Sequence, residues 1–270
     1  MRLISLQSVD PRHTGELASL ASLWVPQLHR AEPVDLRRIE PKRFGAELRE
    51  RETLVVVGGT TLGRDDLRDR LAHLLDATRD SARTHFVVWG AGAAGELSAA
   101  DHELLARAEL AGVRFADPRW VQVGDPSALH PALSLVGAPT HPTVVYAQEG
   151  DAALARAARE HDWPLLIEHG PDVGRAIAFV LSGATVLTSS YHGAYWGLVG
   201  GRRVGVVAED GRVVDGLGLV AHQGADAVER ARADARRVRG LGARCRSANL
   251  DFADRVLGLV ARVGGTHAYW

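Results

Sequence analysis

The chain has 270 residues, of which 46% are hydrophobic, and its formal net charge is -1 at pH 7. This length is enough to bury a large core, either in one α/β domain or in two smaller ones. A net charge near zero supplies no general basic field, so we expect no nucleic-acid partner. The single cysteine, Cys245, excludes an intrachain disulfide and a cysteine-based zinc site, and it suits the reducing cytoplasm where we place the protein. No apolar run approaches the roughly 20 residues of a membrane span, so we expect none.

The first half of the chain alternates between short apolar runs and amphipathic stretches. The runs predict strands at Arg2–Leu6, Val34–Ile39, Thr53–Val57, His85–Trp89, Val113–Ala116 and Trp120–Val123. The amphipathic stretches predict helices at Gly15–Leu23, Asp65–Thr78 and Ser98–Ala111. Asp101 follows Ser98 at the spacing of a capping box. Such alternation is typical of a parallel sheet with helices on both faces.

Prolines interrupt this pattern in the middle of the chain, at Pro126, Pro131, Pro139 and Pro142. We therefore expect a hinge at 131–142, between an N-terminal domain, 1–130, and a C-terminal domain, 143–270. Beyond the hinge, strands are predicted at Thr143–Ala147, Leu165–Glu168, Ala184–Thr188 and Val204–Ala208. Helices are predicted at Asp151–Glu160, Asp172–Leu181, Ala225–Arg239 and Asn249–Val263, and between Ser189 and Gly200. The predicted fold class is α/β, with two Rossmann-like parallel-sheet domains facing a cleft.

The most informative segment, Ala184–Val207, has the pattern of a βαβ unit. A β-rich run turns at Ser189-Ser190-Tyr191-His192-Gly193 into a helix of small and aromatic residues, and a second strand follows. Ligands of parallel sheets bind beyond the carboxyl ends of the strands, where His192 falls, and a helix N-terminus there attracts anions. His192 could protonate a leaving group or stabilise it electrostatically. The alternative is that Ser189 or Ser190 only caps the helix and that His192 is a surface residue of its first turn.

This segment, together with Gly200-Gly201-Arg202-Arg203-Val204, resembles the signature of the polysaccharide pyruvyl transferase family. The family carries a motif of the type Ser-x-Arg-Leu-His-Gly, and its members have a GT-B-like fold of two Rossmann-like domains. His192 matches the family's histidine, which acts on the transferred or leaving group. Ser190 stands in place of the arginine that helps to hold the donor phosphate, and Tyr191 in place of the leucine.

The resemblance implies a transferase of bacterial exopolysaccharide biosynthesis, with His192 as the catalytic residue. It would move a pyruvyl or glycosyl group from a phosphate-activated donor, phosphoenolpyruvate or a nucleotide-sugar, to a sugar or glycoconjugate acceptor. The donor would lie against the C-terminal domain, at Ser189, Ser190, Tyr191 and Gly193. His169 ends a predicted strand at the same edge, so it either binds the donor phosphate too or is an ordinary turn histidine. If the donor is phosphoenolpyruvate, Arg175 or Arg202 would have to replace the missing arginine. We expect no cofactor and no metal, because the helix dipole and the histidine can neutralise the leaving group; the donor, the acceptor and a homo-oligomeric state stay open.

The N-terminal half has looser likenesses to the same family. Thr53–Leu62 resembles a strand that ends in a glycine-rich loop, Phe86–Gly92 resembles the next strand, and His13–Leu17 resembles an Asn-x-Gly-Asp-x-Leu motif. Glycines let a substrate approach backbone N–H groups, and threonines can donate hydrogen bonds to it. The acceptor would therefore lie against the N-terminal domain, at Gly58, Gly59, Thr60, Thr61, Gly90 and Gly92. The alternative is that Gly58-Gly59-Thr60-Thr61 is an ordinary βα turn.

Two other functions stay open. The run Gly90-Ala91-Gly92-Ala93-Ala94-Gly95 matches the G-x-G-x-x-G fingerprint, with Asp117 where a ribose-binding acid would lie, so the protein could be an NAD(P)-dependent oxidoreductase. Against this, Leu97-Ser98 marks a helix start beyond the glycines, and earlier strands precede the motif.

The other alternative is a catalytically inactive member of the same fold that binds a sugar or nucleotide. Ser190 in place of the family's arginine would be the first sign that catalysis is lost.

Overall fold

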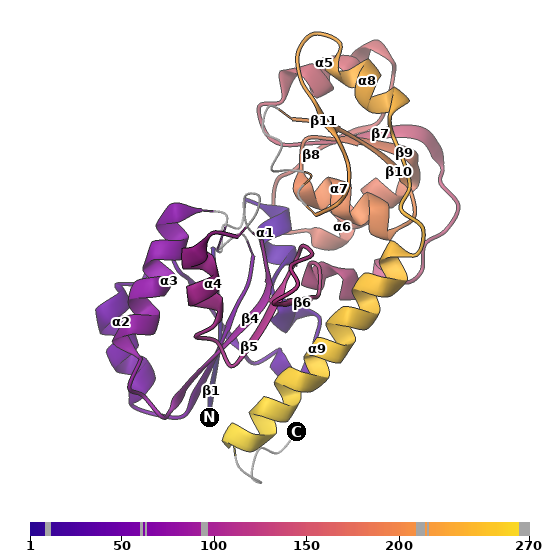
Figure 1. The fold of residues 1–270 in the computed structure, drawn as a ribbon. Helices are drawn as coiled ribbons and strands as arrows, with labels where there is room; N and C mark the ends of the chain where they lie inside the picture. Colours follow the sequence, from indigo (N-terminus) through magenta and orange to yellow (C-terminus); the bar gives the residue numbers. More distant parts are fainter. Residues whose placement is uncertain are drawn as a thin grey trace. The chain divides into compact units, whose positions relative to one another are not determined.

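The protein consists of two compact α/β units, each with its own sheet (Figure 1). The computed structural model describes residues 1–8, 12–59, 62, 64–92, 97–208, 214 and 216–264. The first unit comprises Met1–Asp10, Ala18–Ser127 and Ser247–Trp270, and the second comprises Pro11–Leu17 and Ala128–Arg246. All strands that pair within the two sheets run parallel, so the predicted fold class of two parallel-sheet α/β units is confirmed.

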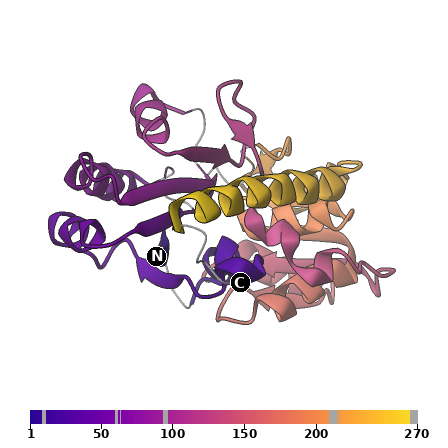
Figure 2. The ribbon, with the colours of Figure 1, turned by 90° about the horizontal axis from the view of Figure 1, so that it is seen from below.

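The first unit has a six-stranded sheet with helices on both faces. The sheet has the order β2-β1-β3-β4-β5-β6. Its strands are β1 (Arg2–Gln7), β2 (Glu32–Asp35), β3 (Thr53–Val57), β4 (Thr84–Ala91), β5 (Leu110–Val113) and β6 (Val121–Gln122). One face is covered by α2 (Pro41–Arg49), α3 (Asp65–Ala77) and α4 (Ala99–Leu105), whose leucines and Phe44 form one core with the strands. The opposite face is covered by part of α9 (Leu241–Gly264), where the Phe252 ring lies edge-on to the Trp89 ring at 5.1 Å (Figure 2).

The second unit has a five-stranded sheet in the order β11-β10-β9-β7-β8. Its strands are β7 (His141–Ala147), β8 (Leu165–Ile167), β9 (Gly183–Thr188), β10 (Arg203–Val207) and β11 (Ala221–His222). The helices α5 (Ala152–Glu160) and α8 (Ala227–Ala233) share a core with one face of this sheet. The helices α6 (Val173–Ser182) and α7 (Tyr191–Val199) lie on the other face, as Figure 1 shows.

The two sheets have the same topology when each is followed from its own first strand. In both units the second strand lies on one side of the first strand, and the third strand lies on the other side. The strand order therefore reverses between β1 and β3 in the first unit and between β7 and β9 in the second. Such topological switch points, at the carboxyl ends of the strands, are where open parallel sheets bind ligands. Each unit thus has one edge at which a binding site is expected.

Local helix signals explain where the elements differ from the predicted ones. The strand predicted at Val34–Ile39 is β2, which ends at Asp35, and the helix α2 that follows it was not predicted. Pro41 occupies the first turn of α2, and the Glu40 side chain accepts hydrogen bonds from the backbone N–H groups of Lys42 and Arg43. Proline is favoured at a helix start because its N–H, which it lacks, would have no helical partner there.

The capping box predicted at Ser98 is confirmed, but the helix α4 ends at Leu105 instead of Ala111.

The units differ from the predicted domains at both ends of the C-terminal half. The segment 131–142, predicted as a hinge, lies within the second unit, which begins at Ala128 apart from Pro11–Leu17. Residues 247–264 of α9 belong to the first unit, because buried polar contacts attach them there. Trp89 Nε1 donates to Asn249 Oδ1 at 2.8 Å, and Asn249 Nδ2 donates to the carbonyl oxygen of Val123 at 2.6 Å.

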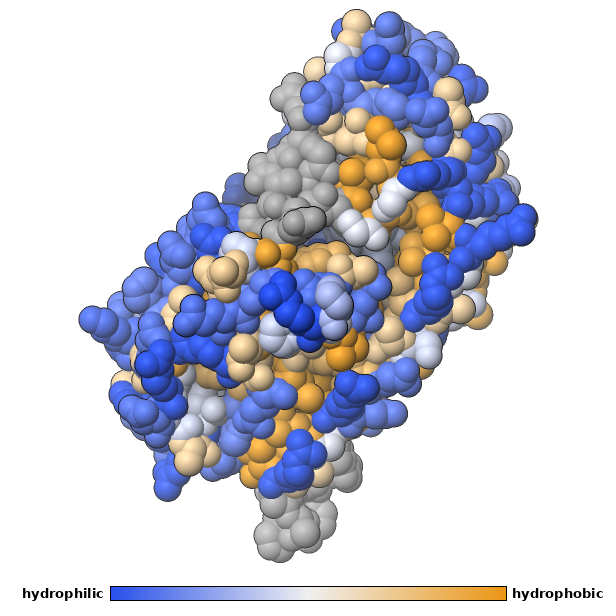
Figure 3. All heavy atoms as spheres, in the orientation of Figure 1, coloured by the Kyte–Doolittle hydropathy of each residue, from blue (hydrophilic) through white to orange (hydrophobic). Residues whose placement is uncertain are grey.

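The described surface is mainly hydrophilic on the face drawn in Figure 3, with smaller apolar areas between the polar side chains. Leu135 and Val220 are the most exposed of its large apolar side chains, at 83% and 60%. Exposed apolar side chains that occur singly are ordinary on protein surfaces. Within the described ranges, no helix combines the length and the apolar character needed to cross a bilayer.

Candidate functional site

The Ser189–Gly193 turn lies at the switch point of the second sheet. β9 ends at Thr188 and α7 begins at Tyr191, so Ser189 and Ser190 connect them. The Ser189 hydroxyl accepts a hydrogen bond at 3.0 Å from the backbone N–H of Gln148, the residue that follows β7. The turn therefore joins the carboxyl ends of β7 and β9, the two strands between which the strand order reverses. The sequence segment that resembles a transferase signature occupies the place where this fold binds ligands.

Ser190 and Gly193 both have structural roles in this turn. Ser190 is the N-cap of α7, and its hydroxyl accepts from the backbone N–H of Gly193 at 3.5 Å. Its own N–H donates to Thr188 Oγ1 at 3.0 Å. A Cβ added to Gly193 would overlap the side chains of Thr188 and Tyr146, so only glycine lets α7 pack this closely on the sheet. The capping alternative thus applies to Ser190, and the helix start stands directly over the strand ends.

His192 is buried, contrary to the alternative that it is a surface residue. Its exposed fraction is 6%, and every residue of α7 from His192 to Val199 is buried. The imidazole centroid lies 5.2 Å from the Tyr191 ring and 5.5 Å from the Trp196 ring. On another side it touches Gly15, where an added Cβ would overlap the ring. A buried imidazole is unfavourable unless its ring nitrogens have polar partners, whereas those of a surface histidine can be hydrated.

Glu168, rather than His169, points into the second unit at the end of β8. Glu168 is 8% exposed, and its Oε1 accepts a hydrogen bond at 3.1 Å from the backbone N–H of Gly15. His169 is exposed. The sheet register decides this orientation: Leu166 pairs with Tyr146 on β7, so Glu168, two residues further, lies on the same face as Tyr146. The sequence singled out His169 and missed Glu168, because strand periodicity without the register does not show which residue faces α7.

Tyr146 is a second buried polar residue on this face that the sequence did not indicate. It is fully buried, and its hydroxyl makes no hydrogen bond of good geometry within the described ranges. Burial raises the pKa of this hydroxyl above the usual tyrosine value, the Glu168 carboxylate raises it further, and the nearby Thr14 hydroxyl opposes the shift. Tyr146 therefore stays protonated, and the negative charge of Glu168 favours this neutral form.

We expect Tyr146→Phe to reduce the loss of stability at alkaline pH. Because the folded pKa is raised, the wild-type protein keeps this contribution below the usual value of 10.0 and loses it as the pH rises through the folded pKa. The free energy of unfolding, measured with urea at pH 8 and pH 10.5, should fall less in Tyr146→Phe than in the wild type. At pH 8 the variant should be about as stable as the wild type, because the substitution removes no hydrogen bond of good geometry among the described residues. Equal losses in both proteins would contradict this assignment.

A cavity of about 620 Å³ opens at the same edge of the second sheet. It lies at the strand ends and at the start of α5, and it is lined by Gln148–Ala153, Ser189, Val207, Ala208, His222, Gln223, Gly224 and Ala227. Its volume is that of a site for a nucleotide-sized molecule. Ala152 and Ala153 bring the first turn of α5, and so its partial positive charge, to the cavity wall. Within the described part of the chain, no group of three or more His, Cys, Asp and Glu residues could hold a metal ion.

The predicted acceptor-binding glycines that are described lie together at the carboxyl ends of β3 and β4, and Gly58 and Gly59 lie at the switch point of the first sheet. Gly58 and Gly59 follow β3, and Gly92, just after β4, donates its N–H to the Gly59 carbonyl oxygen at 2.9 Å. Gly59 and Gly90 have positive φ angles, of 73° and 66°. A Cβ on Gly58 would lie only 3.1 Å from the Gln7 side chain, which comes from β1 on the other side of the switch point. Thr60 and Thr61 lie outside the described residues.

The geometry does not favour the dinucleotide fingerprint at Gly90–Gly95. A fingerprint helix starts within the glycines, whereas α4 starts at Ala99 with Ser98 as its cap. The motif also follows β4, which is not one of the two strands at the switch point. Residues 93–96 lie outside the described residues. Asp117, the expected ribose ligand, is engaged by Arg119, whose backbone N–H donates to it at 2.9 Å.

Of the two arginines that could replace the missing one, Arg202 lies at the wrong edge of the sheet. It directly precedes β10, whose first residue, Arg203, pairs with Thr185 near the amino end of β9. Its side chain is buried there and donates to the Gly137 carbonyl oxygen at 2.6 Å. Arg175 lies in the first turn of α6, beyond the carboxyl end of β8, and is exposed. Arg175 alone of the two is on the same edge as the Ser189–Gly193 turn.

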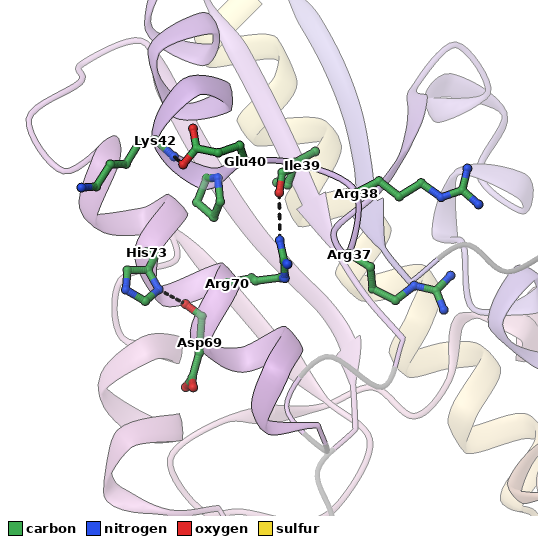
Figure 4. A pocket seen from close by; sticks show the side chains of 9 residues that line it. Arg37, Arg38, Ile39, Glu40, Lys42, Asp69, Arg70 and His73 are labelled. Atoms are coloured by element: carbon green, nitrogen blue, oxygen red, sulfur yellow. Dashed lines mark hydrogen bonds between the residues drawn. The ribbon is translucent and has the colours of Figure 1, made fainter.

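A second open hollow, of about 610 Å³, lies at the outer edge of the first sheet (Figure 4). It is formed by the residues after β2, the start of α2 and the middle of α3, and it is lined by Arg37, Arg38, Ile39, Glu40, Pro41, Lys42, Asp69, Arg70 and His73. Arg70 is held there by the Ile39 carbonyl oxygen at 2.9 Å. β2 is an edge strand, so this basic hollow lies away from the switch point. None of the predicted site residues that the structure describes lines it.

Comparison with known proteins gives distant similarities of fold only. No family model matches the chain, and no curated protein matches it. One similar structure is a protein of uncharacterised function from Klebsiella pneumoniae, at 14% identity and a TM-score of 0.43 over 77% of this chain and 84% of that one. Another, described as a UDP-N-acetylglucosamine 2-epimerase from Listeria monocytogenes, has 12% identity and a TM-score of 0.48 over 100% and 93% of the two chains. An alpha-glucosyltransferase in complex with UDP and DNA has 11% identity and a TM-score of 0.41 over 98% and 99%. Similarities at this level carry no argument about function.

Proposed function

We propose that this protein is a GT-B-like transferase that moves a glycosyl or pyruvyl group from a phosphate-activated donor to a sugar acceptor. One observation carries the proposal: the buried His192 stands in the first turn of α7, at the carboxyl ends of the two strands that flank the switch point of the second sheet. A histidine in that position can give a proton to a leaving phosphate oxygen or stabilise its negative charge. The resemblance of this segment to the polysaccharide pyruvyl transferase signature supports the same chemistry.

In the proposed reaction, the bond between the transferred group and the donor phosphate oxygen breaks. A new bond forms to an acceptor hydroxyl oxygen, whose proton is released, while the leaving phosphate keeps the bonding electrons. In the pyruvyl case two such bonds form, to two acceptor hydroxyls, and one of their protons goes to the methylene carbon of the donor. His192 protonates that phosphate or stabilises it. The donor lies in the cavity of the second unit, beside Ser189 and the start of α5. His192 is not one of the described residues that line this cavity, so the donor phosphate has to reach it past Ser189. The acceptor lies at the glycines of the first unit, Gly58, Gly59, Gly90 and Gly92.

A nucleotide-sugar suits the second unit better than phosphoenolpyruvate does. Ser190 replaces the arginine that would hold the phosphate of phosphoenolpyruvate, and Arg202 lies at the opposite edge of the sheet. The cavity of about 620 Å³ has room for a nucleoside diphosphate. Its described lining residues include no arginine or lysine, and Glu149 and Asp151 are acidic. The start of α5 would therefore have to neutralise the diphosphate, with Asp151 engaged as its N-cap.

A ligand screen by thermal shift tests the proposed function. Nucleotide-sugars should raise the melting temperature by several degrees, because a ligand at about 100 times its Kd stabilises the folded protein by about 2.7 kcal/mol. Ala152→Asp should abolish this shift, since the new carboxylate faces the cavity at the helix start. Ala178→Asp, an exposed change on α6 on the other face of the sheet, should retain it. A shift with NAD(P)H alone would favour the oxidoreductase, and no shift with any nucleotide-sugar or with phosphoenolpyruvate would contradict the proposal.

A further inference from the structure

The Arg12–Leu17 segment, near the start of the chain, is bonded to the end of β8. The backbone N–H of Gly170 donates to the Arg12 carbonyl oxygen at 3.1 Å, and Thr14 Oγ1 donates to the Gly170 carbonyl oxygen at 2.6 Å. The N–H of Gly15 donates to Glu168 Oε1 at 3.1 Å across a sequence separation of 153 residues. Three hydrogen bonds to consecutive parts of one strand end hold this segment in the second unit, to which Pro11–Leu17 belongs.

Gly15 places its bare Cα against the imidazole ring of His192. A Cβ built on Gly15 would overlap three ring atoms, Nδ1, Cγ and Cε1. No real side chain approaches that closely, so residue 15 must be glycine as long as the ring stays where it is. With the Tyr191 and Trp196 rings on other sides, Gly15 completes the enclosure of His192.

The buried carboxylate of Glu168 is an energetically unfavourable acceptor for a backbone N–H. Its carboxylate is buried, and within the described ranges its one hydrogen-bond donor is the backbone N–H of Gly15, with no cationic side chain paired to it. Burying a carboxylate without a cation is unfavourable, and an amide or hydroxyl could accept the same N–H at less cost. The Glu168 oxygen nevertheless fixes the Gly15 N–H, and an amide oxygen at the same position would do the same.

We propose that Gly15 and Glu168 are positioning residues for His192. Glu168 fixes the Gly15 N–H, and Gly15 fixes the imidazole in the first turn of α7, so a segment from the start of the chain sets the orientation of the reactive side chain. That His192 is reactive rests on the proposed function, but the arrangement of the three residues does not. The inference can therefore be tested without a known substrate.

The test measures how fast diethylpyrocarbonate modifies His192, located by peptide mass spectrometry, with the exposed His73 as internal reference. In the wild type this buried ring should react slowly. Gly15→Ala should raise its rate at least several-fold, because the new Cβ displaces the ring. Gly137→Ala is the matched control, since a Cβ there meets nothing within 4 Å, and it should react like the wild type. An unchanged rate in a folded Gly15→Ala protein would overturn the inference.

Glu168 variants test the inference if Gly15→Ala fails to fold. Glu168→Ala removes the acceptor of the Gly15 N–H and should raise the rate of His192 modification several-fold. Glu168→Gln keeps an acceptor oxygen of similar shape and should restore most of the protection. Equal rates in Glu168→Ala and the wild type would overturn the inference, as would a Gln variant that behaves like the Ala variant. If these rates change as expected but the wild type transfers no group from any donor, the proposed function fails and the positioning role stands.

Discussion

His192→Ala should lower the turnover number on the order of a hundredfold or more, the usual scale for the loss of general acid–base help. Its ring is buried in the first turn of α7 and is enclosed by Tyr191, Trp196 and Gly15. The measurement is a steady-state assay with the nucleotide-sugar that gives the largest thermal shift. The Michaelis constant for the donor should change much less than the turnover number, because the cavity residues remain.

The substitution His192→Gln separates the two roles that this histidine can have. An amide donates a hydrogen bond but does not exchange a proton, so it should restore little of the rate if His192 is a general acid. If His192 only stabilises charge, His192→Gln or His192→Lys should recover part of the rate. A His192→Ala protein that turns over at the wild-type rate would remove the residue on which the proposed function depends.

Asp125→Ala should destabilise the first unit by about 3–5 kcal/mol, the range measured when one partner of a buried ion pair is removed. Asp125 is fully buried and forms an ion pair with Arg114, which is also buried. It further accepts from the Ser19 hydroxyl at 2.8 Å and from the backbone N–H of Ser127 at 2.8 Å. Removing the carboxylate leaves the Arg114 charge in the interior, where water does not compensate for it.

A matched surface substitution controls for the general effect of losing an aspartate. Asp76→Ala breaks ion pairs with Arg79 and Arg107, but Asp76 is half exposed. We expect it to cost no more than about 1 kcal/mol. Urea unfolding followed by tryptophan fluorescence includes the signal of Trp89 in the first unit, and the midpoints of the two variants are compared with that of the wild type. Similar losses of stability for the two variants would show that the Asp125–Arg114 pair contributes no more than an exposed one.

The parts of the site that could be predicted from the sequence are those that depend on neighbouring residues. A β-rich run, two serines and a helix of small residues indicate a strand–turn–helix connection, and the structure has that connection at β9 and α7. The residues that enclose His192 could not be predicted in this way. Gly15 comes from 153 residues before Glu168, and Glu168 faces inward only because of the register between β7 and β8. Such long-range pairings leave no local periodicity to detect.

The same limit explains the missed helix and the domain ends. Glu40-Pro41 starts α2 directly after a short edge strand, and the strand pattern before it continues across the boundary. The C-terminal helix has one continuous amphipathic pattern, although its residues belong to both units. Contacts between distant residues, such as those of Asn249 with Trp89 and Val123 and of Phe252 with Trp89, show that its second part is attached to the first sheet.

The distribution of the chain between the two units has a practical consequence for making fragments of this protein. The chain passes from one unit to the other after Asp10, Leu17, Ser127 and Arg246. A break at the proline-rich segment would therefore yield an N-terminal piece without the part of α9 that covers Trp89. It would also yield a C-terminal piece without Gly15, and with Phe252 and Val256 uncovered. Isolated units for crystallisation or NMR would have to be built as linked chains, with residues 247–264 joined to the first and residues 12–17 joined to the second.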